Sequence, residues 1–357
     1  MNSLPLKTPL LCSDSYKNCL SSLDTNKNIA EVWKSIILHS EPIICPISDG
    51  GDSLISSIIF HLDRQNIYWE SIPEGILWKK NDADSTVQVL IESSKFLQSD
   101  EPVSLRSSEG LAQALIDTLK YKPCKIIVGL GGSKTIDLGI GIFHKLGGIA
   151  YDKTMNRIGP TLEEWQNIYH IDNTKMVFPR NVYVELWADV DCPCRNVVDF
   201  IPQKGGGEYE TKLVNNVIEQ MDQMLAVSMD TNIDEYAQFG GSSGGVSIGM
   251  KFTGMRVTAY PGLHQFISTF IPQWNNYLKS ASCIVSGAGR IDRTSYHGKV
   301  EEKLSQLAKK LNKLAILICG DWDEISLKEL AYMIVRVGEQ CDFEKAISQI
   351  ANNVLFK

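Results

Sequence analysis

Short apolar runs alternate along the chain with segments in which apolar residues recur every three or four positions. The runs predict buried strands, and the second pattern predicts helices with one buried face. We expect strands over 10–13, 42–47, 125–128, 283–286, 314–319 and 333–337. We expect helices over 24–39, with Asp24 as the N-cap, over 111–119 and over 300–311. This alternation predicts an α/β protein.

The patterning divides the chain into two kinds of segment. Between residues 66 and 280 it is more mixed, and the stretches 68–69, 87–91 and 183–187 have the pattern of half-buried strands. We therefore predict two α/β domains. A Rossmann-like open sheet is formed by residues 1–65 and 281–357, and a second, mixed α/β domain is inserted over 66–280.

Glycines and an acidic residue follow several of the predicted strands. In open α/β sheets, ligands bind at the carboxyl ends of the strands. Four loops of this chain have that arrangement, so we expect them to meet at one ligand-binding site.

Composition narrows the class of protein. The chain has 357 residues, of which 43% are hydrophobic and 22% are charged, as in soluble globular proteins. Its net charge of −7 excludes a basic nucleic-acid-binding protein. A local group of backbone N–H donors can still hold a small anion on an acidic protein. We therefore expect small-molecule ligands and no nucleic acid.

The compartment is expected to be the cytoplasm. No apolar run approaches the ~20 residues that a membrane span requires, and the amino terminus lacks the regions of a secretory signal. The nine cysteines are an odd number and are scattered, without a CxxC pair. Several lie in strand-like runs, where a reduced thiol packs as a small apolar group. We expect no membrane partner and a reducing compartment.

A glycine-rich segment, GLGGSKTIDLG, occupies residues 129–139. Gly131, Gly132 and Ser133 can present successive N–H groups to an anion. The segment lacks the spacing of a Walker A loop and of GxGxxG, so a plain strand-to-helix turn stays an alternative. Asp137 is expected on the first turn of the following helix.

A second glycine-rich segment, GGSSGG, occupies residues 240–245. Its hydroxyl and N–H groups suit contact with an anion, which makes Ser243 and Gly244 candidate ligand contacts. A flexible linker is an equally good interpretation of this composition.

The stretch 286–299 is the strongest candidate for chemistry. Arg290, Asp292, His297 and Lys299 follow the turn Gly-Ala-Gly within a few residues. Arginine offers a planar fork to a phosphate or carboxylate, lysine a point charge, and aspartate a base or a magnesium ligand. The alternative is a charged loop in solvent.

Acidic residues follow other strands as well. Asp189 and Asp191 are two positions apart at the end of the 183–187 strand, so on an extended backbone both would face one side. Such a pair suits Mg²⁺ or a base, and a solvated strand end is the alternative. Lys17 follows the first strand, and the second is followed by Asp49, Gly50 and Gly51.

These motifs occur in one order that resembles a known family. They read SDSYK at 13–17, SDGG at 48–51, GLGGS at 129–133, DVDCP at 189–193, PQKG at 202–205, GG at 244–245, GAGRID at 287–292 and HGK at 297–299. Their order is similar to that of the bacterial glycerate kinase family, of the glycerate 2-kinase type, from about residue 10 to 340.

The resemblance implies an activity and a place for it. It implies transfer of the γ-phosphoryl group of ATP to a hydroxyl of D-glycerate, with Mg²⁺, in a cleft between two α/β domains. The expected product is phosphoglycerate, in particular 2-phosphoglycerate. The implied partners are ATP and glycerate, and a homodimer is among the oligomeric states left open.

The resemblance also suggests roles for site residues. Lys17, Arg290 and Lys299 would neutralise phosphate and substrate carboxylate, because phosphoryl transfer depends on positioning and charge neutralisation. One of Asp137, Asp189 and Asp292 would orient the hydroxyl, and Asp189 or Asp292 would hold Mg²⁺. Substrate or phosphate contacts are expected from Asp49, Gly50, Gly51, Gly131, Gly132, Ser133, Ser243, Gly244, His297 and Lys299.

The chain also departs from the family motifs. Lys134, Ile136 and Leu138 stand where the family has Ala, Asn and Gly, and Ala288 stands where it has Glu. A diverged member with weak or lost activity, and a kinase of another small hydroxy acid, therefore remain alternatives. A nucleotide-binding enzyme of another kind, such as a dehydrogenase, is disfavoured by the missing GxGxxG.

Overall fold

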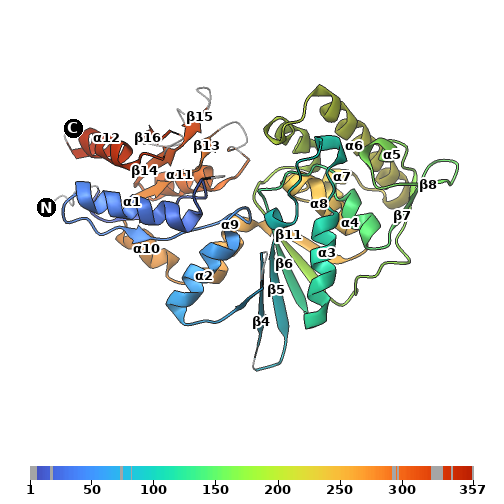
Figure 1. The fold of residues 1–357 in the computed structure, drawn as a ribbon, viewed down its shortest axis with the longest axis horizontal. Helices are drawn as coiled ribbons and strands as arrows, with labels where there is room; N and C mark the ends of the chain where they lie inside the picture. Colours follow the sequence, from blue (N-terminus) through green and yellow to red (C-terminus); the bar gives the residue numbers. More distant parts are fainter. Residues whose placement is uncertain are drawn as a thin grey trace. The chain divides into compact units, whose positions relative to one another are not determined.

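The chain forms two compact units. The computed structural model describes residues 6–16, 19–72, 75–81, 83–291, 295, 297–322, 333–338 and 341–355. The first unit comprises Met1–Tyr68 and Leu263–Lys357, and the second comprises Trp69–Gly262. Both are α/β, as the alternation of strand and helix patterns predicts. Figure 1 shows the amino-terminal segment, in blue, beside the carboxyl-terminal segments, in orange and red, within the first unit.

The first unit contains a five-stranded sheet with all its strands parallel, in the order β16-β14-β12-β1-β2. Its elements are β1 (Pro9–Leu11), α1 (Ser22–Ile36), β2 (Ile43–Ile44), α2 (Leu54–Gln65), α9 (Gly262–Phe270), α10 (Trp274–Ser280), β12 (Cys283–Ser286), β13 (Arg290–Ile291), α11 (Val300–Lys310), β14 (Leu314–Cys319), β15 (Asp321–Trp322), β16 (Met333–Arg336) and α12 (Phe343–Leu355).

The pairing of β1 with β12 joins the two ends of the chain. Pro9 lies opposite Cys283, and Leu11 lies opposite Val285. Apolar residues from both ends share one core, in which α1 packs against α12. The predicted Rossmann-like sheet from the amino- and carboxyl-terminal parts is confirmed.

The second unit contains a six-stranded mixed sheet in the order β11-β10-β6-β5-β4-β3. Its strands are β3 (Glu70–Ile72), β4 (Ile76–Lys80), β5 (Val87–Glu92), β6 (Lys125–Leu130), β10 (Tyr183–Ala188) and β11 (Arg256–Pro261), with a small sheet of β7 (Ile149–Tyr151), β8 (Arg157–Ile158) and β9 (His170–Asp172). Its helices are α3 (Glu109–Thr118), α4 (Ile140–Lys145), α5 (Leu162–Trp165), α6 (Glu208–Met229), α7 (Ile233–Tyr236) and α8 (Val246–Phe252).

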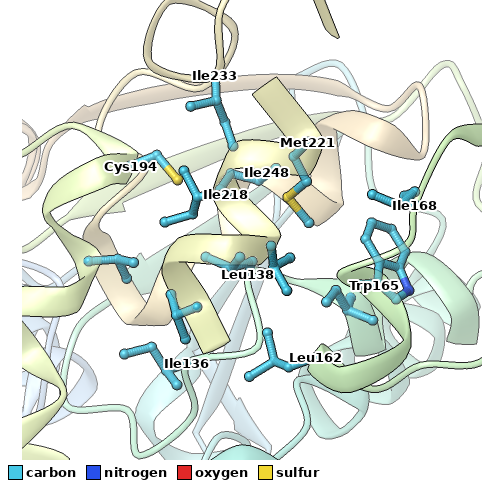
Figure 2. Packing of buried hydrophobic residues seen from close by; sticks show 14 of the residues in the cluster. Ile136, Leu138, Leu162, Trp165, Ile168, Cys194, Ile218, Met221, Ile233 and Ile248 are labelled. Carbon is cyan, nitrogen blue, oxygen red and sulfur yellow. The ribbon is translucent and has the colours of Figure 1, made fainter. Parts of the chain in front are cut away.

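Short 3-10 helices fill several connections of the second unit. They are η1 (Ser93–Lys95), η2 (Val103–Leu105), η3 (Leu119–Tyr121), η4 (Cys194–Phe200), η5 (Pro202–Lys204) and η6 (Ser242–Gly245). β5, β6, β10 and β11 run parallel, whereas β3 and β4 are antiparallel to their neighbours. Two large apolar clusters contribute to the core, and one of them includes Leu138, Trp165 and Ile248 (Figure 2).

The boundary of the second unit differs from the expected one. We expected the inserted segment to end at residue 280, whereas the second unit ends at Gly262. Helix α9 belongs to the first unit because it packs against α2. The rings of His61 and Phe266 meet edge to face at 5.8 Å, and Gln65 Nε2 donates to the carbonyl oxygen of Phe270 at 2.9 Å.

The start of α1 also differs from the prediction. Its N-cap is Ser21, whose hydroxyl accepts a hydrogen bond from the backbone N–H of Asp24 at 3.1 Å. Asp24 lies in the first turn instead, where the helix dipole stabilises its negative charge. Serine and aspartate are both common N-cap residues. The path of the backbone places Ser21 at the N-cap position.

The structure also bears on membrane crossing. Among the helices of the described residues, none combines the length and the apolar character that a membrane span needs.

Candidate functional site

Loops of the second unit meet at the carboxyl edge of its sheet. The parallel register places Glu92 opposite Gly129 and Ala188 opposite Leu130. Ser93, Gly131 and Asp189 therefore begin adjacent loops at one edge. The backbone N–H of Asp189 donates to the carbonyl oxygen of Leu130 at 3.1 Å, which keeps the last two of these loops together.

The loop after β6 presents hydrogen-bond donors. Gly132 has a φ of 62°, a left-handed conformation that glycine adopts at little cost. Within the described residues, the N–H groups of Gly131, Gly132 and Ser133 donate to no protein acceptor. Ser133 is 6% exposed. An anion-binding nest requires successive donors of this kind, and that this segment binds an anion stays a prediction.

The second glycine-rich loop packs directly on the first. The backbone N–H of Leu138 donates to the carbonyl oxygen of Gly244 at 2.9 Å. A Cβ atom at Gly244 would lie 2.1 Å from the carbonyl oxygen of Thr135, so a side chain cannot be placed there without movement. Residues 242–245 are buried in η6, which excludes the interpretation of this loop as a flexible linker.

Ser243 lies in this contact. Its backbone is left-handed, with a φ of 48°, and its hydroxyl oxygen is buried without a hydrogen-bond partner in the described part of the chain. A left-handed serine costs about 1–2 kcal/mol, and a buried hydroxyl without a partner adds to that cost. Such local strain is typical of functional loops, which supports Ser243 as a ligand contact.

Asp137 holds the loop together from inside. Its carboxylate accepts hydrogen bonds from Ser108 N at 2.7 Å, Ser108 Oγ at 2.8 Å, Gly141 N at 3.0 Å and Gly139 N at 3.1 Å. Burial raises the pKa of Asp137, and these hydrogen bonds oppose that shift. The four contacts are within the chain, so they indicate a structural role and lend no support to the expected catalytic one.

The expected position of Asp137 was wrong. Helix α4 begins at Ile140, so Asp137 precedes the helix rather than lying in its first turn. It accepts from the N–H of Gly141 because a carboxylate before a helix can reach the unpaired donors of the first turn.

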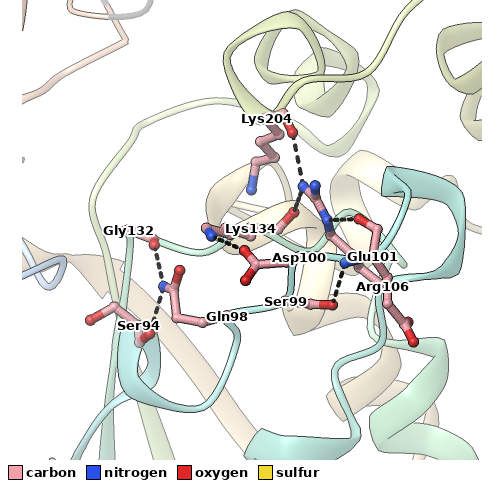
Figure 3. Close-up of polar contacts among 9 residues, drawn as sticks. All are labelled: Ser94, Gln98, Ser99, Asp100, Glu101, Arg106, Gly132, Lys134 and Lys204. Atoms are coloured by element: carbon pink, nitrogen blue, oxygen red, sulfur yellow. Dashed lines mark hydrogen bonds and ion pairs between the residues drawn. The ribbon is translucent and has the colours of Figure 1, made fainter. Parts of the chain in front are cut away.

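The residues that depart from the family motif leave these donors in place. Lys134 Nζ pairs with Asp100 Oδ1 at 2.8 Å, an ion pair at the surface (Figure 3). Ile136 and Leu138 are buried in the apolar cluster of Figure 2. Leu138 has a φ of 55°, a conformation that favours glycine, so its buried side chain offsets backbone strain.

Asp189 and Asp191 do not form the pair that strand geometry predicts. Strand β10 ends at Ala188, and both acids follow it in a non-extended segment. Asp189 is half-buried, whereas Asp191 is exposed. The alternation of sides applies only within a strand, and here the strand ends before both acids.

The first unit has its own carboxyl edge with candidate residues. The backbone N–H of Asp14, after β1, donates to the carbonyl oxygen of Gly287, after β12, at 2.9 Å. A Cβ atom at Gly287 would lie 1.7 Å from the carbonyl oxygen of Ile318. Glycine is therefore required where the two strand ends approach β14.

Several carboxylates gather at this edge. Asp49 is 4% exposed and Glu301 is 2% exposed. The pKa of the half-buried Asp14 is raised well above its usual range, first by loss of solvation and then by the charges of Asp49, Glu301 and Asp52. Gly50 and Gly51 form the turn beside Asp49, whose Oδ1 accepts from the N–H of Gly51 at 3.2 Å.

The structure describes three of the basic residues expected at this edge. Arg290 lies on the short strand β13 and is exposed to solvent. His297 and Lys299 are half-buried just before α11, with Lys299 as the N-cap residue. Lys17 and Asp292 lie outside the described residues. The four glycine-bearing loops thus lie at two sheet edges, one in each unit.

The donor chemistry fits Mg²⁺ only as a nucleotide-borne ion. Among the described residues, no group of three or more His, Cys, Asp or Glu side chains is placed to hold a metal. Mg²⁺ is usually held by one or two carboxylates together with substrate phosphates. The carboxylate of Asp189 can supply such a ligand at the edge of the second unit.

Two basic residues were missed by the sequence argument. Lys204 Nζ donates to Ser133 Oγ at 3.0 Å, and Arg106 Nη1 donates to the carbonyl oxygen of Lys134 at 3.2 Å. Lys204 belongs to the quoted PQKG motif, so a signal was available. The spacing of the motifs does not show that the Lys204 side chain reaches a loop about 70 residues earlier. Only the fold brings the two segments together.

Known proteins are similar to this chain in sequence and in fold. A profile of the Glycerate kinase family matches residues 9–356. The chain is 24% identical over 329 residues to the glycerate 2-kinase of Escherichia coli K12, covering 87% of this chain and 84% of that protein. It is 26% identical over 326 residues to a glycerate kinase of Haemophilus influenzae, covering 87% and 85%.

A solved structure agrees in fold. A crystal structure assigned as glycerate kinase 2 from Salmonella typhimurium LT2 superposes with a TM-score of 0.61 at 20% identity, over 97% of this chain and 95% of that one. The family profile spans nearly the whole chain, which confirms the resemblance carried by the motifs. The chain therefore belongs to the glycerate kinase family, and it is a kinase, a transferase with an α/β fold.

Proposed function

We propose that this kinase transfers the γ-phosphoryl group of ATP to a hydroxyl of D-glycerate, with 2-phosphoglycerate as the product. Family membership and the names of the relatives support the substrate class. The single observation that carries the proposal is the row of N–H donors at Gly131, Gly132 and Ser133, with no protein acceptor in the described chain. Such a row is suited to the anionic oxygens of a phosphate or a carboxylate.

The reaction needs few chemical groups from the protein. The oxygen of a glycerate hydroxyl attacks the γ-phosphorus, a new P–O bond forms, and the bond to the bridging oxygen of ADP breaks. The hydroxyl proton passes to a base. Positioning of the reactants and stabilisation of charge on the transferred group supply most of the catalysis.

Roles follow for the residues at the two edges. Lys17, Arg290 and Lys299 are the proposed partners of phosphate and carboxylate charge, and Asp189 or Asp292 the proposed base. When bound, Mg²⁺ would neutralise phosphate charge, and Asp189 or Asp292 would be its ligand. That both edges serve one reaction stays a prediction.

The departures from the family motif are compatible with activity. Lys134 is engaged by Asp100, and the side chains of Ile136 and Leu138 are buried in the core. None of these residues takes an N–H donor away from Gly131, Gly132 or Ser133. We therefore favour an active kinase over a diverged member without turnover.

An ADP-release assay tests the proposal. With ATP and Mg²⁺, we expect release that depends on D-glycerate, and phosphorus NMR of the product should show 2-phosphoglycerate. L-glycerate and other small hydroxy acids are the comparison substrates. Release with one of these, but not with D-glycerate, would replace the proposed substrate. Measurable ATP binding without turnover on any of them would contradict the kinase proposal.

Arg290 offers a matched pair of variants. Arg290→Ala should reduce kcat/KM by about 10²-fold, because it removes one stabilising donor. Arg256→Ala changes another exposed arginine, on β11, and should leave the kinetics unchanged. Equal kinetics for the two variants would remove Arg290 from the site.

Three wider expectations stay predictions. The two units are proposed as the domains of the enzyme, with Trp69–Gly262 as the inserted one. The cytoplasmic location continues to rest on the odd and scattered cysteines. A homodimer is open to measurement of the mass in solution.

A further inference from the structure

Lys204 clamps the loop that follows β6. Its ammonium donates to the carbonyl oxygen of Ser133 at 2.9 Å, to Ser133 Oγ at 3.0 Å and to the carbonyl oxygen of Thr135 at 2.8 Å. Figure 3 shows the Lys204 side chain extending toward this loop from η5. Lys204 is half-buried, and all three of these hydrogen bonds go to one short segment.

Other side chains complete the clamp. Gln98 Nε2 donates to the carbonyl oxygen of Gly132 at 2.9 Å, and Arg106 Nη1 donates to that of Lys134 at 3.2 Å. Arg106 Nη1 also donates to the backbone carbonyl oxygen of Lys204 at 2.8 Å, which ties the Arg106 side chain to the backbone of η5 (Figure 3). Side chains therefore hold four successive carbonyl groups, those of residues 132–135.

This clamp determines where the donors of the loop point. In a trans peptide the carbonyl of one residue and the N–H of the next point in opposite directions. Because Gln98 holds the carbonyl of Gly132, the N–H of Ser133 points away from Gln98. Holding the carbonyl of Gly132 thus fixes the N–H of Ser133, one of the donors available to a ligand.

The hydroxyl of Ser133 is constrained in the same way. Lysine has no hydrogen-bond acceptor, so Ser133 Oγ must be the acceptor in its contact with Lys204. The hydroxyl hydrogen is left to be donated elsewhere. No protein group in the described residues accepts it, although Ser133 is only 6% exposed.

We propose that Lys204 is a positioning residue of the kinase, which acts through Ser133. It orients the O–H donor of Ser133 toward an anionic oxygen of a substrate, while Gln98 holds the peptide of the Ser133 N–H, and the charge of Lys204 strengthens the hydroxyl as a donor. Phosphate of the nucleotide and carboxylate of the hydroxy acid share this chemistry. The inference rests on the proposed function for the identity of the ligand, but not for the geometry of the loop.

Kinetics of Lys204→Met provide the first test. Methionine has a side chain of similar length to lysine but no charge. We expect kcat/KM to fall by about 10²- to 10³-fold. A rise confined to the KM for ATP would identify a phosphate at the loop, and a rise confined to the KM for glycerate a carboxylate. Lys212→Met, an exposed lysine on α6, is the control and should match the wild type.

Two further readouts separate positioning from folding. Methylammonium should restore activity to Lys204→Ala, because it can occupy the place of the missing ammonium. Lys204→Met combined with Ser133→Ala should lose little more activity than the worse of the two single variants, since both act on one donor. Fully additive losses, or no rescue by methylammonium, would overturn the action through Ser133.

Hydrogen–deuterium exchange tests the geometry without any assay of activity. In the ligand-free protein, Lys204→Met should speed exchange of the peptide covering 131–136, whereas Lys212→Met should not. Unchanged exchange would overturn the proposal even if the enzyme is active. Faster exchange in a protein that phosphorylates no hydroxy acid would leave the clamp standing and reject the proposed function.

Discussion

At the scale of single residues, the surroundings of a carboxylate decide its role. Asp137 and Asp14 both lie in loops that follow parallel strands. Asp137 is buried among four hydrogen-bond donors, which oppose the rise in its pKa that burial causes. Asp14 has other carboxylates beside it, and its pKa is raised. The ionised form of Asp14 is therefore costly for folding.

The pH dependence of stability tests this difference. Because the pKa of Asp14 is raised on folding, the folded protein binds more protons than the unfolded one as the pH rises above about 4, so stability falls over that range. Asp14→Asn removes the charge. Its melting temperature should exceed that of the wild type at pH 7, and the difference should disappear near pH 4.

A matched control sharpens this experiment. Asp63→Asn changes an exposed carboxylate on α2 in the same unit and should alter stability by less than about 0.5 kcal/mol at any pH. Differential scanning calorimetry from pH 4 to pH 8 measures both variants. Parallel curves for Asp14→Asn and the wild type would show that the Asp14 charge is not destabilising.

At the scale of elements, two glycine-rich loops act as one unit. Gly244 contacts the backbone of Thr135 and Ile136, and Gly245 contacts Leu138. The sequence of each loop, taken alone, is also compatible with a plain turn or a linker. Their contact shows that the second loop supports the first, and both glycines have a positive φ that permits this approach.

Two glycine-to-alanine variants test the contact. Gly244 and Gly205 have φ values of 71° and 85°, so alanine is strained at both by about 1 kcal/mol. Only Gly244 also lacks space, since a Cβ at Gly205 meets nothing within 4 Å. Gly244→Ala should therefore cost about 1–3 kcal/mol more than Gly205→Ala. Urea denaturation measures both, and equal losses would contradict the tight contact.

Most elements were predictable because they are local. The strands over 283–286 and 314–319 coincide with β12 and β14, since each is a short apolar run bounded by polar residues or glycine. The two-residue strand β2 is shorter than the predicted 42–47. Its length depends on its partner β1, which offers few positions for pairing.

At the scale of the whole molecule, the two units differ in how the chain builds them. The second unit is one continuous segment, with its six-stranded sheet and its two large apolar clusters inside 69–262. The first unit needs both ends of the chain, because β1 lies between β2 and β12 in its sheet. This arrangement predicts different behaviour for the isolated pieces.

Fragments test that prediction. The segment 69–262 expressed alone should fold, with dispersed amide signals in NMR and a cooperative thermal transition. The segment 263–357 alone should not, because β12 would lose β1 as a neighbour. A folded carboxyl-terminal fragment, or an unfolded 69–262, would contradict this division of the chain.

The sequence by itself determined the α/β class, the split sheet and the family, because hydrophobic period and motif order are local or linear properties. It also singled out the loops at 131–133 and 240–245. Only the tertiary structure decided that these loops pack together, that Asp137 is an internal brace and that Lys204 holds Ser133. Such contacts join residues far apart in the chain, and strand register and backbone path place them in ways that composition and spacing do not encode.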